Sequence, residues 1–218
     1  MKREKIPPTT VARLPLYLRS LQLAQNQNID SISSFELARL TGHNPAQLRK
    51  DLSYLGEFGT RGVGYEVDEL IRHISRWLGI VKVRSVVLVG AGHLGQALAN
   101  YRGFVDKGFK IVGIFDNDGA KIGSGLAGLS VKHVSELKAS SFPEPIDIGI
   151  IATPADVAQR AADILVQAGV RSILNFAPHR LEVGDGVCVR NVDLSTELQI
   201  IGFHLASIEH GLSSDCCS

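Results

Sequence analysis

The chain has 218 residues, of which 44% are hydrophobic and 21% are charged, so it is long enough for one or two domains with buried cores and unlike a largely disordered protein. No apolar run approaches the roughly 20 residues that a membrane helix needs, and the opening MKREKIPPTT lacks the apolar centre of a signal peptide, so we expect a cytoplasmic protein. Its three cysteines, Cys188 alone and Cys216 beside Cys217, form neither a disulfide framework nor a four-ligand zinc site.

Charge is distributed unevenly along the chain. Residues 1–84 carry 13 Lys and Arg and 8 Asp and Glu, a net +5, whereas residues 85–218 carry 10 and 14, a net −4. A basic first part joined to a mildly acidic second part indicates two domains, the first of which faces a polyanion. Since a net +5 also occurs on ordinary solvated surfaces, the sequence motifs must show whether the first domain binds a polyanion.

Two amphipathic helices are predicted first. Thr9 and Thr10 are candidate caps of the first helix, and Pro15 should fall near its first turn because proline bends a helix interior. Its apolar residues recur at three- and four-residue steps: Val11, Leu14, Leu18 and Leu21. The segment SSFELARL then offers Ser34 as the cap of a second helix. In that helix the apolar residues expected to point inward are Leu37 and Leu40.

A third helix is predicted over residues 44–54. Asn44 supplies a capping side chain and Pro45 a preset backbone angle at the first helical position. Because only the short turn TGH separates it from the preceding helix, the pair is a helix-turn-helix candidate. One stripe of this helix is apolar, comprising Leu48, Leu52 and Leu55. The outward residues are of types that contact phosphates and base edges: Gln47, Arg49, Lys50, Ser53 and Tyr54.

A glycine-rich segment, GEFGTRGVGYEV, follows this helix and predicts a tight hairpin with Arg61 at its tip, ending in a short strand at residues 65–67. A recognition helix followed by a basic wing is the winged-helix arrangement, and the arginine suits a narrow minor groove. The alternative is a small helical domain with an exposed helix and a loop. A further helical pattern over residues 66–84 meets a stop at Gly79, so we expect a winged-helix domain at residues 1–80 with its boundary near 79–84.

Residues 81–192 alternate apolar runs of strand length with helical segments. The strand candidates are residues 86–89, 110–115, 146–152 and 171–175, and the segment PADVAQRAADILVQAG forms a clear helix before the last of them. This alternation predicts an α/β domain of the Rossmann type, in which a parallel sheet is covered on both faces.

The motif GAGHLG lies between the first of these strands and its helix, where a phosphate-binding turn must lie. Gly90 permits the turn, Gly92 lets the backbone approach a pyrophosphate and Gly95 lets the helix pack on the strand. Amide groups at the helix N-terminus would hold the diphosphate. The expected cofactor contacts in this loop are Gly90, Ala91, Gly92, His93, Leu94 and Gly95.

Asp116 ends the second strand, twenty-one residues after Gly95, where an acid accepts hydrogen bonds from the adenosine ribose hydroxyls. An acid there repels a 2′-phosphate, so NAD(H) is favoured over NADP(H). The alternative is an aspartate that caps a turn, since DNDG is also good turn sequence. The residues that share this strand-end edge, and that we expect to border the cofactor, are Asn117, Thr153, Pro154, Asn175, Phe176 and Ala177.

A dehydrogenase needs a proton-transferring group near the nicotinamide together with a substrate pocket. After NVD at residues 191–193 only about 25 residues follow, and the histidines show no paired acid–base arrangement, so we do not expect an enzyme. Residues 193–218 instead hold a helix with a heptad-like seam, which favours a homodimer over the alternative of packing on its own domain. The seam residues are Leu194, Leu198, Ile201, Leu205 and Ile208. Phe203 projects roughly 160–180° from the seam centre, and so needs a second cavity.

Several segments resemble the Rex family of bacterial redox-sensing transcriptional repressors: RLPLYLRSL, LRKDLSYLGEFGTRGVGY, VGAGHLGQALANY, NFAP and the last helix with Phe203. The resemblance covers nearly the whole chain. It implies a homodimer whose winged-helix domains bind an inverted-repeat operator DNA, with Arg13 and Asn44 among the contacts. Its Rossmann domains would bind NADH and NAD+ in competition. Arg102 departs from the proline of some members, which leaves the role of Tyr101 in doubt.

The resemblance also implies a domain-swapped last helix that sends Phe203 toward the partner's nicotinamide pocket. The nicotinamide ring is cationic in NAD+ and neutral in NADH, so an apolar pocket closed by an aromatic ring disfavours the oxidised form through desolvation. If NADH also prefers a closed dimer whose recognition helices no longer match the half-site spacing, NADH releases the operator. The alternatives are a small NAD-dependent oxidoreductase and a domain for another nucleotide such as CoA, which Asp116 disfavours.

Overall fold

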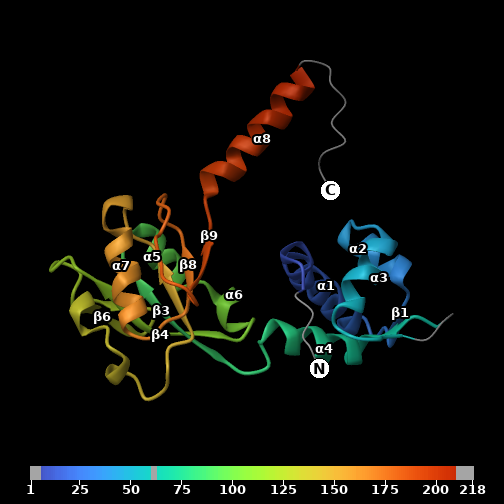
Figure 1. Ribbon diagram of the computed structural model, residues 1–218, viewed down its shortest axis with the longest axis horizontal. Coiled ribbons are helices and arrows are strands. Elements are labelled where there is room, and N and C mark those ends of the chain that lie inside the picture. The colour runs from blue at the N-terminus through green and yellow to red at the C-terminus, as the bar shows by residue number, and fades with distance from the viewer. Residues whose placement is uncertain (1–5, 60–62, 210–218) are drawn as a thin grey trace. The chain divides into compact units, whose positions relative to one another are not determined.

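The computed structural model describes residues 6–59 and 63–209 (Figure 1). Arg61 of the predicted wing, and Cys216 and Cys217, lie outside the described residues. The chain divides between Val81 and Lys82 into two compact units, each of which is described by itself. The division falls inside the segment 79–84.

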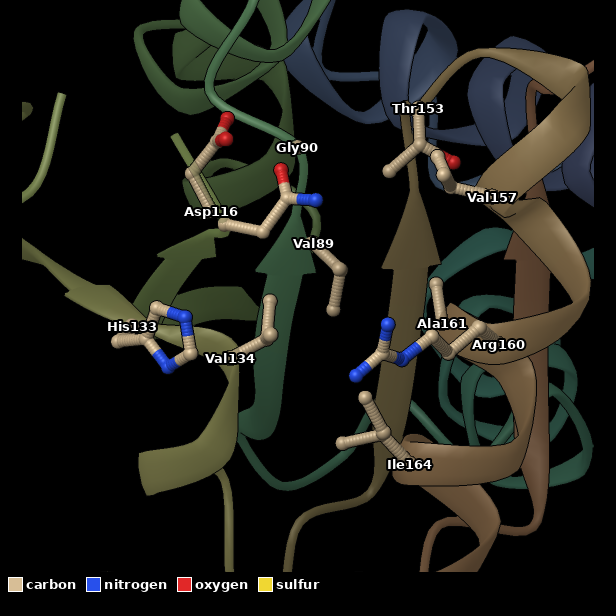
Figure 2. A pocket seen from close by; sticks show the side chains of 11 residues that line it. Val89, Gly90, Asp116, His133, Val134, Thr153, Val157, Arg160, Ala161 and Ile164 are labelled. Atoms are coloured by element: carbon tan, nitrogen blue, oxygen red, sulfur yellow. The ribbon is translucent and has the colours of Figure 1, made fainter. Parts of the chain in front are cut away.

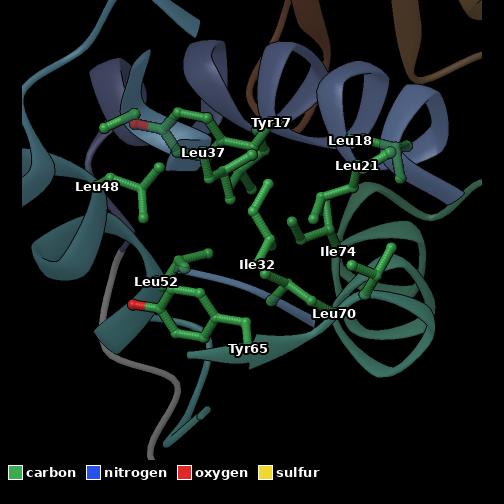
Figure 3. Packing of buried hydrophobic residues seen from close by; sticks show 14 of the residues in the cluster. Tyr17, Leu18, Leu21, Ile32, Leu37, Leu48, Leu52, Tyr65, Leu70 and Ile74 are labelled. Carbon is green, nitrogen blue, oxygen red and sulfur yellow. The ribbon is translucent and has the colours of Figure 1, made fainter. Parts of the chain in front are cut away.

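The first unit is a small helical domain with one short two-stranded sheet. Its elements are α1 (Pro8–Asn26), β1 (Ser31–Ile32), α2 (Ser34–Thr41), α3 (Pro45–Ser53), β2 (Tyr65–Glu66) and α4 (Val67–Leu78). The two strands pair antiparallel, with Ile32 opposite Tyr65. Figure 3 shows the core that holds the helices together, and its central residues are Tyr17, Leu18, Leu21, Leu37, Leu48, Leu52, Leu70 and Ile74. The helix-turn-helix pair, α2 and α3, thus rests on the apolar faces of α1 and α4.

Local signals set the ends of these helices. The side chain of Asn44 accepts a hydrogen bond from the Ala46 amide, and Pro45 is the first residue of α3, as predicted. Gly79 ends α4 in the left-handed conformation, with φ 70°, which also agrees with the prediction. The cap of α2 is Ser33 rather than Ser34, because Ser33 forms a reciprocal capping box with Glu36.

Further expectations for α1 and α2 are wrong. The helix α1 begins at Pro8, so Thr9 and Thr10 are helical residues and not caps, and Pro15 lies inside the helix well past its first turn. Proline suits a helix start because its missing amide hydrogen needs no partner there, which explains the earlier beginning. Val11 and Leu40 are 44% and 53% exposed. The buried stripe of α1 instead includes Tyr17.

The second unit contains a seven-stranded sheet in the order β5-β6-β4-β3-β7-β8-β9. Its strands are β3 (Arg84–Val89), β4 (Phe109–Asp116), β5 (Gly125–Leu126), β6 (Leu129–His133), β7 (Ile148–Ile151), β8 (Ser172–Asn175) and β9 (Cys188–Asn191). All neighbours pair parallel except β5 and β6. From β6 to β9 this is the strand order of dinucleotide-binding folds, and the direction of the order reverses between β3 and β7. The predicted parallel α/β sheet is confirmed.

The helices of this unit are α5 (His93–Ala99), α6 (Arg102–Val105), α7 (Ala155–Gln167) and α8 (Leu194–Glu209), with 3₁₀ turns at Val134–Glu136 and Ala139–Ser141. Alternate residues of β3 face opposite sides of the sheet. Val87 and Val89 pack into the core shared with α7, whereas Val86 and Leu88 pack on the other face. Both faces of the central strands are therefore buried, as an apolar run without polar alternation predicts.

The helix α8 differs from every other long helix of the described chain because none of its residues is buried (Figure 1). The five residues of its predicted seam are between 53% and 68% exposed. In the parts of the chain that the structure describes, no helix has the length and apolar character needed to cross a membrane.

Candidate functional sites

A cavity of about 170 Å³ opens where the strand order of the second unit reverses (Figure 2). The carboxyl ends of β3, β4, β6 and β7 and one face of α7 surround it. Its lining residues are Val89, Gly90, Asp116, Asn117, His133, Val134, Thr153, Val157, Arg160, Ala161 and Ile164. Ligands of open α/β sheets bind in this position, outside the carboxyl ends of the strands. Four residues predicted from the sequence, Gly90, Asp116, Asn117 and Thr153, are brought together here.

The glycine loop has the geometry that its spacing predicts. Gly90 has φ +103°, and a Cβ atom on it would lie 2.5 Å from the carbonyl oxygen of Ala152. A Cβ atom on Gly95 would overlap the carbonyl oxygen of Gly90, so the start of α5 packs directly on the loop. Gly92, by contrast, faces open space. The turn at Gly90 and the close packing at Gly95 are confirmed, and the approach of a pyrophosphate to Gly92 stays a prediction.

Asp116 joins the glycine loop to the end of β4. Its carboxylate accepts hydrogen bonds from the amides of Ala91, at 2.7 Å, and Asp118, at 2.9 Å, and lies 3.4 Å from the Lys121 ammonium. Burial alone would raise the pKa of this carboxyl, but the two amides and Lys121 outweigh it and lower the pKa. Asp116 is therefore ionised at neutral pH. It both stabilises the turn after β4 and lines the cavity.

Thr153 contributes an unsatisfied polar group. Its hydroxyl oxygen is buried and has no hydrogen-bond partner among the described residues, and the side chain lies at the cavity wall (Figure 2). Buried polar atoms are nearly always hydrogen-bonded in native proteins, so an orphaned hydroxyl beside a cavity marks a place where a ligand supplies the partner.

One wall of the cavity was not predicted from the sequence. Figure 2 shows the Arg160 guanidinium pointing into the cavity from α7, with His133 on the opposite side. Among the described residues, no acidic side chain forms an ion pair with the Arg160 guanidinium within 4.0 Å, so its charge faces the cavity. The remaining members of this wall are apolar, namely Val134, Val157, Ala161 and Ile164. Two signals were available: His133 ends the next parallel strand, and the α7 residues recur at three- and four-residue steps.

The residues after β8 hold a turn together. Asn175 is fully buried, and its side-chain amide donates to the carbonyl oxygens of Ala177 and His179 and to Oδ1 of Asn191, at 2.9–3.2 Å. Its carbonyl oxygen accepts from the Ala177 amide. These bonds give Asn175 a turn-forming role, and a direct cofactor contact at this residue stays a prediction.

The other predicted cofactor residues do not line the cavity. His93 and Leu94 are exposed at the start of α5, Pro154 is exposed at the start of α7, Phe176 is half-buried, and Ala91 and Ala177 are buried. Contacts from these residues to a longer ligand stay predictions. No group of three His, Cys, Asp or Glu in residues 6–59 and 63–209 is placed to hold a metal ion.

The outer face of α3 carries a basic group. Arg49, Lys50 and Ser53 are exposed, as predicted, and Tyr54 is half-buried at the end of the helix. Nη1 of Arg49 donates to the Ser34 hydroxyl at 3.0 Å, which links α3 to the start of α2. These side chains can meet phosphates and base edges without rearranging the core.

Arg13 and Gln47, which were predicted to contact DNA, are engaged inside the domain. Arg13 donates from Nε and Nη2 to the buried carboxylate of Asp51, at 2.6 and 2.8 Å, and Nε2 of Gln47 donates to the same group at 2.9 Å. The sequence did hold a signal for Asp51, because it lies three residues after Leu48 on the apolar stripe of α3, where a charge requires buried partners.

Comparison with known proteins agrees with this division of the chain. Residues 5–53 match the family model "Putative DNA-binding protein N-terminus", and residues 81–179 match the model "CoA binding domain". A protein of Streptomyces avermitilis named redox-sensing transcriptional repressor Rex is 54% identical over 91% of this chain and 79% of its own length. A protein of the same name from Desulforamulus reducens is 50% identical over 94% of this chain and 98% of its own.

Solved structures of the Rex-family repressor RSP have the same fold along nearly the whole chain. RSP in complex with β-NAD+ and operator DNA superposes with a TM-score of 0.89 at 38% identity, covering 94% of this chain and 95% of that one. RSP in complex with β-NADH gives a TM-score of 0.84 at 36% identity, with coverage of 94% and 97%.

Proposed function

Because the chain belongs to the Rex family of redox-sensing transcriptional repressors, we propose that it represses genes by binding operator DNA and releases that DNA when NADH replaces NAD+. The observation that carries the proposal is the pairing of two sites in one chain. A cavity with the ionised Asp116 lies at the switch point of the second unit, and α3 of the first unit presents Arg49 and Lys50. The protein is a regulator, not an enzyme, and its site of action is the cytoplasm.

The charge of Asp116 selects among adenine nucleotides. The Asp116 carboxylate accepts hydrogen bonds from the two free hydroxyls of the NAD(H) adenosine ribose. NADP(H) carries a phosphate on the 2′ oxygen of this ribose and CoA carries one on the 3′ oxygen, so both place a negative charge beside Asp116. Although residues 81–179 match a CoA-binding model, the acid at this position favours NAD(H).

We also propose that the protein is a homodimer in which α8 packs on the partner. The support is an uncovered apolar surface on each side of the contact. The seam of α8 is exposed, and the sheet face opposite α7 contains an apolar cavity of about 270 Å³. Residues lining this cavity are Val86, Phe104, Phe109, Ile148, Ile150, Ser172, Ile173, Leu174, Cys188 and Arg190. A two-fold pair of chains would bury both surfaces.

Phe203 connects this dimer with redox discrimination. It is 68% exposed and projects away from the seam, so the swapped helix would carry it to the partner's nicotinamide. Desolvation by the aromatic ring disfavours the cationic nicotinamide of NAD+ relative to the neutral ring of NADH. Preference of NADH for a closed dimer would then move the two α3 helices out of register with the operator half-sites.

A titration with operator DNA tests the proposal. Fluorescence anisotropy should show tight binding of the full-length protein to an inverted repeat from its own upstream region. NADH should release the DNA at concentrations where NAD+ has little effect, and NADPH and CoA should be inactive. Equal effects of NADH and NAD+ would refute redox sensing, and hydride turnover without salt-sensitive operator binding would favour an oxidoreductase. Light scattering of the same sample should give the mass of a dimer.

A further inference from the structure

The recognition helix α3 carries a fully buried carboxylate on its inner face. Asp51 is 0% exposed and accepts five hydrogen bonds. Three of its partners lie on α1: Thr10 Oγ1 at 2.9 Å, Arg13 through Nε and Nη2 at 2.6 and 2.8 Å, and the Tyr17 hydroxyl at 2.7 Å. The fourth, Gln47, donates from the preceding turn of α3 at 2.9 Å. Every partner donates its hydrogen bond, so this set of side chains suits an ionised carboxylate, which only accepts hydrogen bonds.

The network is ionised at neutral pH. Burial alone would raise the pKa of the Asp51 carboxyl, but the hydrogen bonds from Arg13, Tyr17, Gln47 and Thr10 outweigh burial and lower the pKa to about 2. The same contacts raise the pKa of the Arg13 guanidinium above its already high value. Because a buried ion pair often adds little net stability relative to apolar residues of similar size, its use here calls for another explanation.

The hydrogen bonds to Asp51 fix the orientation of α3 on α1 more narrowly than apolar packing does. Leu48 and Leu52, on either side of Asp51, pack against Leu37 and the core (Figure 3), and such contacts tolerate small rotations and slides of a helix. Five hydrogen bonds to one carboxylate admit a single arrangement of α3 on α1. Since each residue of an α-helix spans 100° of rotation, the angle at Asp51 sets where its neighbours Arg49 and Lys50 point.

We propose that Asp51 is a positioning residue for operator recognition, and that Arg13 and Gln47 act on DNA binding through Asp51 rather than by contacting DNA. The inference rests on the proposed function of α3 as the DNA-reading helix. Arg13 and Asp51 together carry no net charge, and two nitrogens of the guanidinium fork are committed to the carboxylate. An arginine engaged in this way contributes little to neutralising a DNA phosphate.

Salt dependence distinguishes positioning from contact. Each phosphate contact contributes about 0.9 to the slope of log K against log salt concentration, so removing a contact lowers the slope by that amount. Arg13→Met should weaken operator binding about 10-fold or more while the slope stays at its wild-type value. Arg49→Met, the matched control on the exposed face of α3, should lower the slope by about 0.9. A lower slope in Arg13→Met would overturn the proposal.

A double-mutant cycle provides the second test. If Arg13 acts only through Asp51, Asp51→Asn combined with Arg13→Met should bind operator no more weakly than the weaker of the two single variants. Losses that multiply would show an independent contact from Arg13 and would overturn the proposal.

Tyr17→Phe keeps the test decisive if the charge variants unfold. Tyr17 is 0% exposed, so it cannot touch DNA, and the change removes one hydrogen bond to Asp51 while keeping the ring. We expect weaker operator binding, a smaller loss on non-specific DNA and an unchanged affinity for NADH. Operator affinity equal to that of the wild type would contradict the positioning role. In that case the wild-type protein would still release operator with NADH, so the proposed function would stand.

Discussion

Each unit of the molecule buries one aspartate at its functional element, and the two are built for opposite purposes. Asp51 is enclosed by side chains from α1 and α3, and its carboxylate accepts five hydrogen bonds within the domain. Asp116 accepts three hydrogen bonds, from two main-chain amides and one lysine, at the wall of a cavity that is also lined by Thr153, whose hydroxyl has no partner among the described residues. A closed network defines one geometry, whereas an open one leaves hydrogen-bonding capacity for a ligand. Four changes test this contrast.

The largest expected effect is on the stability of the first unit. Asp51→Ala leaves the Arg13 charge and the Tyr17 hydroxyl without their acceptor, so the free energy of unfolding should fall by about 3 to 5 kcal/mol. Urea denaturation followed by circular dichroism measures it. The corresponding change in the second unit, Asp116→Ala, should cost less, because Lys121 keeps its partner Asp118 at 3.3 Å. Equal losses in the two variants would remove the distinction between a closed and an open network.

The next effect is on ligand binding by the second unit. Asp116→Asn removes the charged acceptor of the ribose hydroxyls, so NADH affinity should fall about 10- to 100-fold, as expected for a hydrogen bond to a charged group. NADPH should gain affinity because the repulsion of its phosphate is lost. The matched control is Asp118→Asn in the same turn, whose exposed side chain lies outside the cavity lining. A fluorescence titration measures all three proteins, and equal losses in both variants would contradict the role of Asp116.

Acid should affect the closed network in a defined window. The pKa of Asp51 is lowered from 3.8 to about 2, so its contribution to stability is complete above pH 4 and is lost as pH falls from about 4 to about 2. In Asp51→Asn this component of the pH dependence should be missing. Denaturant midpoints measured between pH 2 and pH 6 test the expectation. The same slope in the variant and the wild type would assign the acid sensitivity to other carboxylates.

The smallest expected effect is that of removing the Thr153 hydroxyl, which has no hydrogen-bond partner among the described residues. Thr153→Val replaces a hydroxyl that has no partner in the described structure, so it should leave the unfolding free energy unchanged or slightly raised. NADH affinity should still fall about 3- to 10-fold if the ligand uses this hydroxyl, a loss of about 1 kcal/mol. Calorimetric titration and thermal denaturation measure the two quantities. An unchanged affinity would show that the ligand does not bond to Thr153.

The sequence predicts the parts of the molecule that depend on neighbours along the chain. The GAGHLG turn, the Asn44 cap and the parallel sheet follow from local spacing, and the structure has all three. Asp116 was found because its position relative to the glycine loop is fixed by one strand and one helix. In the same way, the apolar seam of α8 is visible in the sequence, although a single chain does not cover it.

What the sequence does not predict depends on contacts between distant segments. Arg13 and Asp51 are 38 residues apart, so no local pattern shows that a basic residue suited to DNA is bound to a buried acid. Arg160 lines the cavity because α7 packs beside strands that are distant from it in the sequence. The start of α1 was predicted wrongly because Thr9 and Thr10 suit a helix cap, whereas the proline pair before them suits the first helical positions, and the helix begins at Pro8.

The exposed seam of α8 has a consequence for the life of the protein in the cell. A helix with this much bare apolar surface is a liability to a newly synthesised chain, which is vulnerable to chaperones, proteases and aggregation until a second chain covers it. If the subunit is stable only in the dimer, dilution destabilises it, because the folded population depends on the total protein concentration. The cellular concentration of the repressor then determines how long each chain survives as well as how fully its operators are occupied.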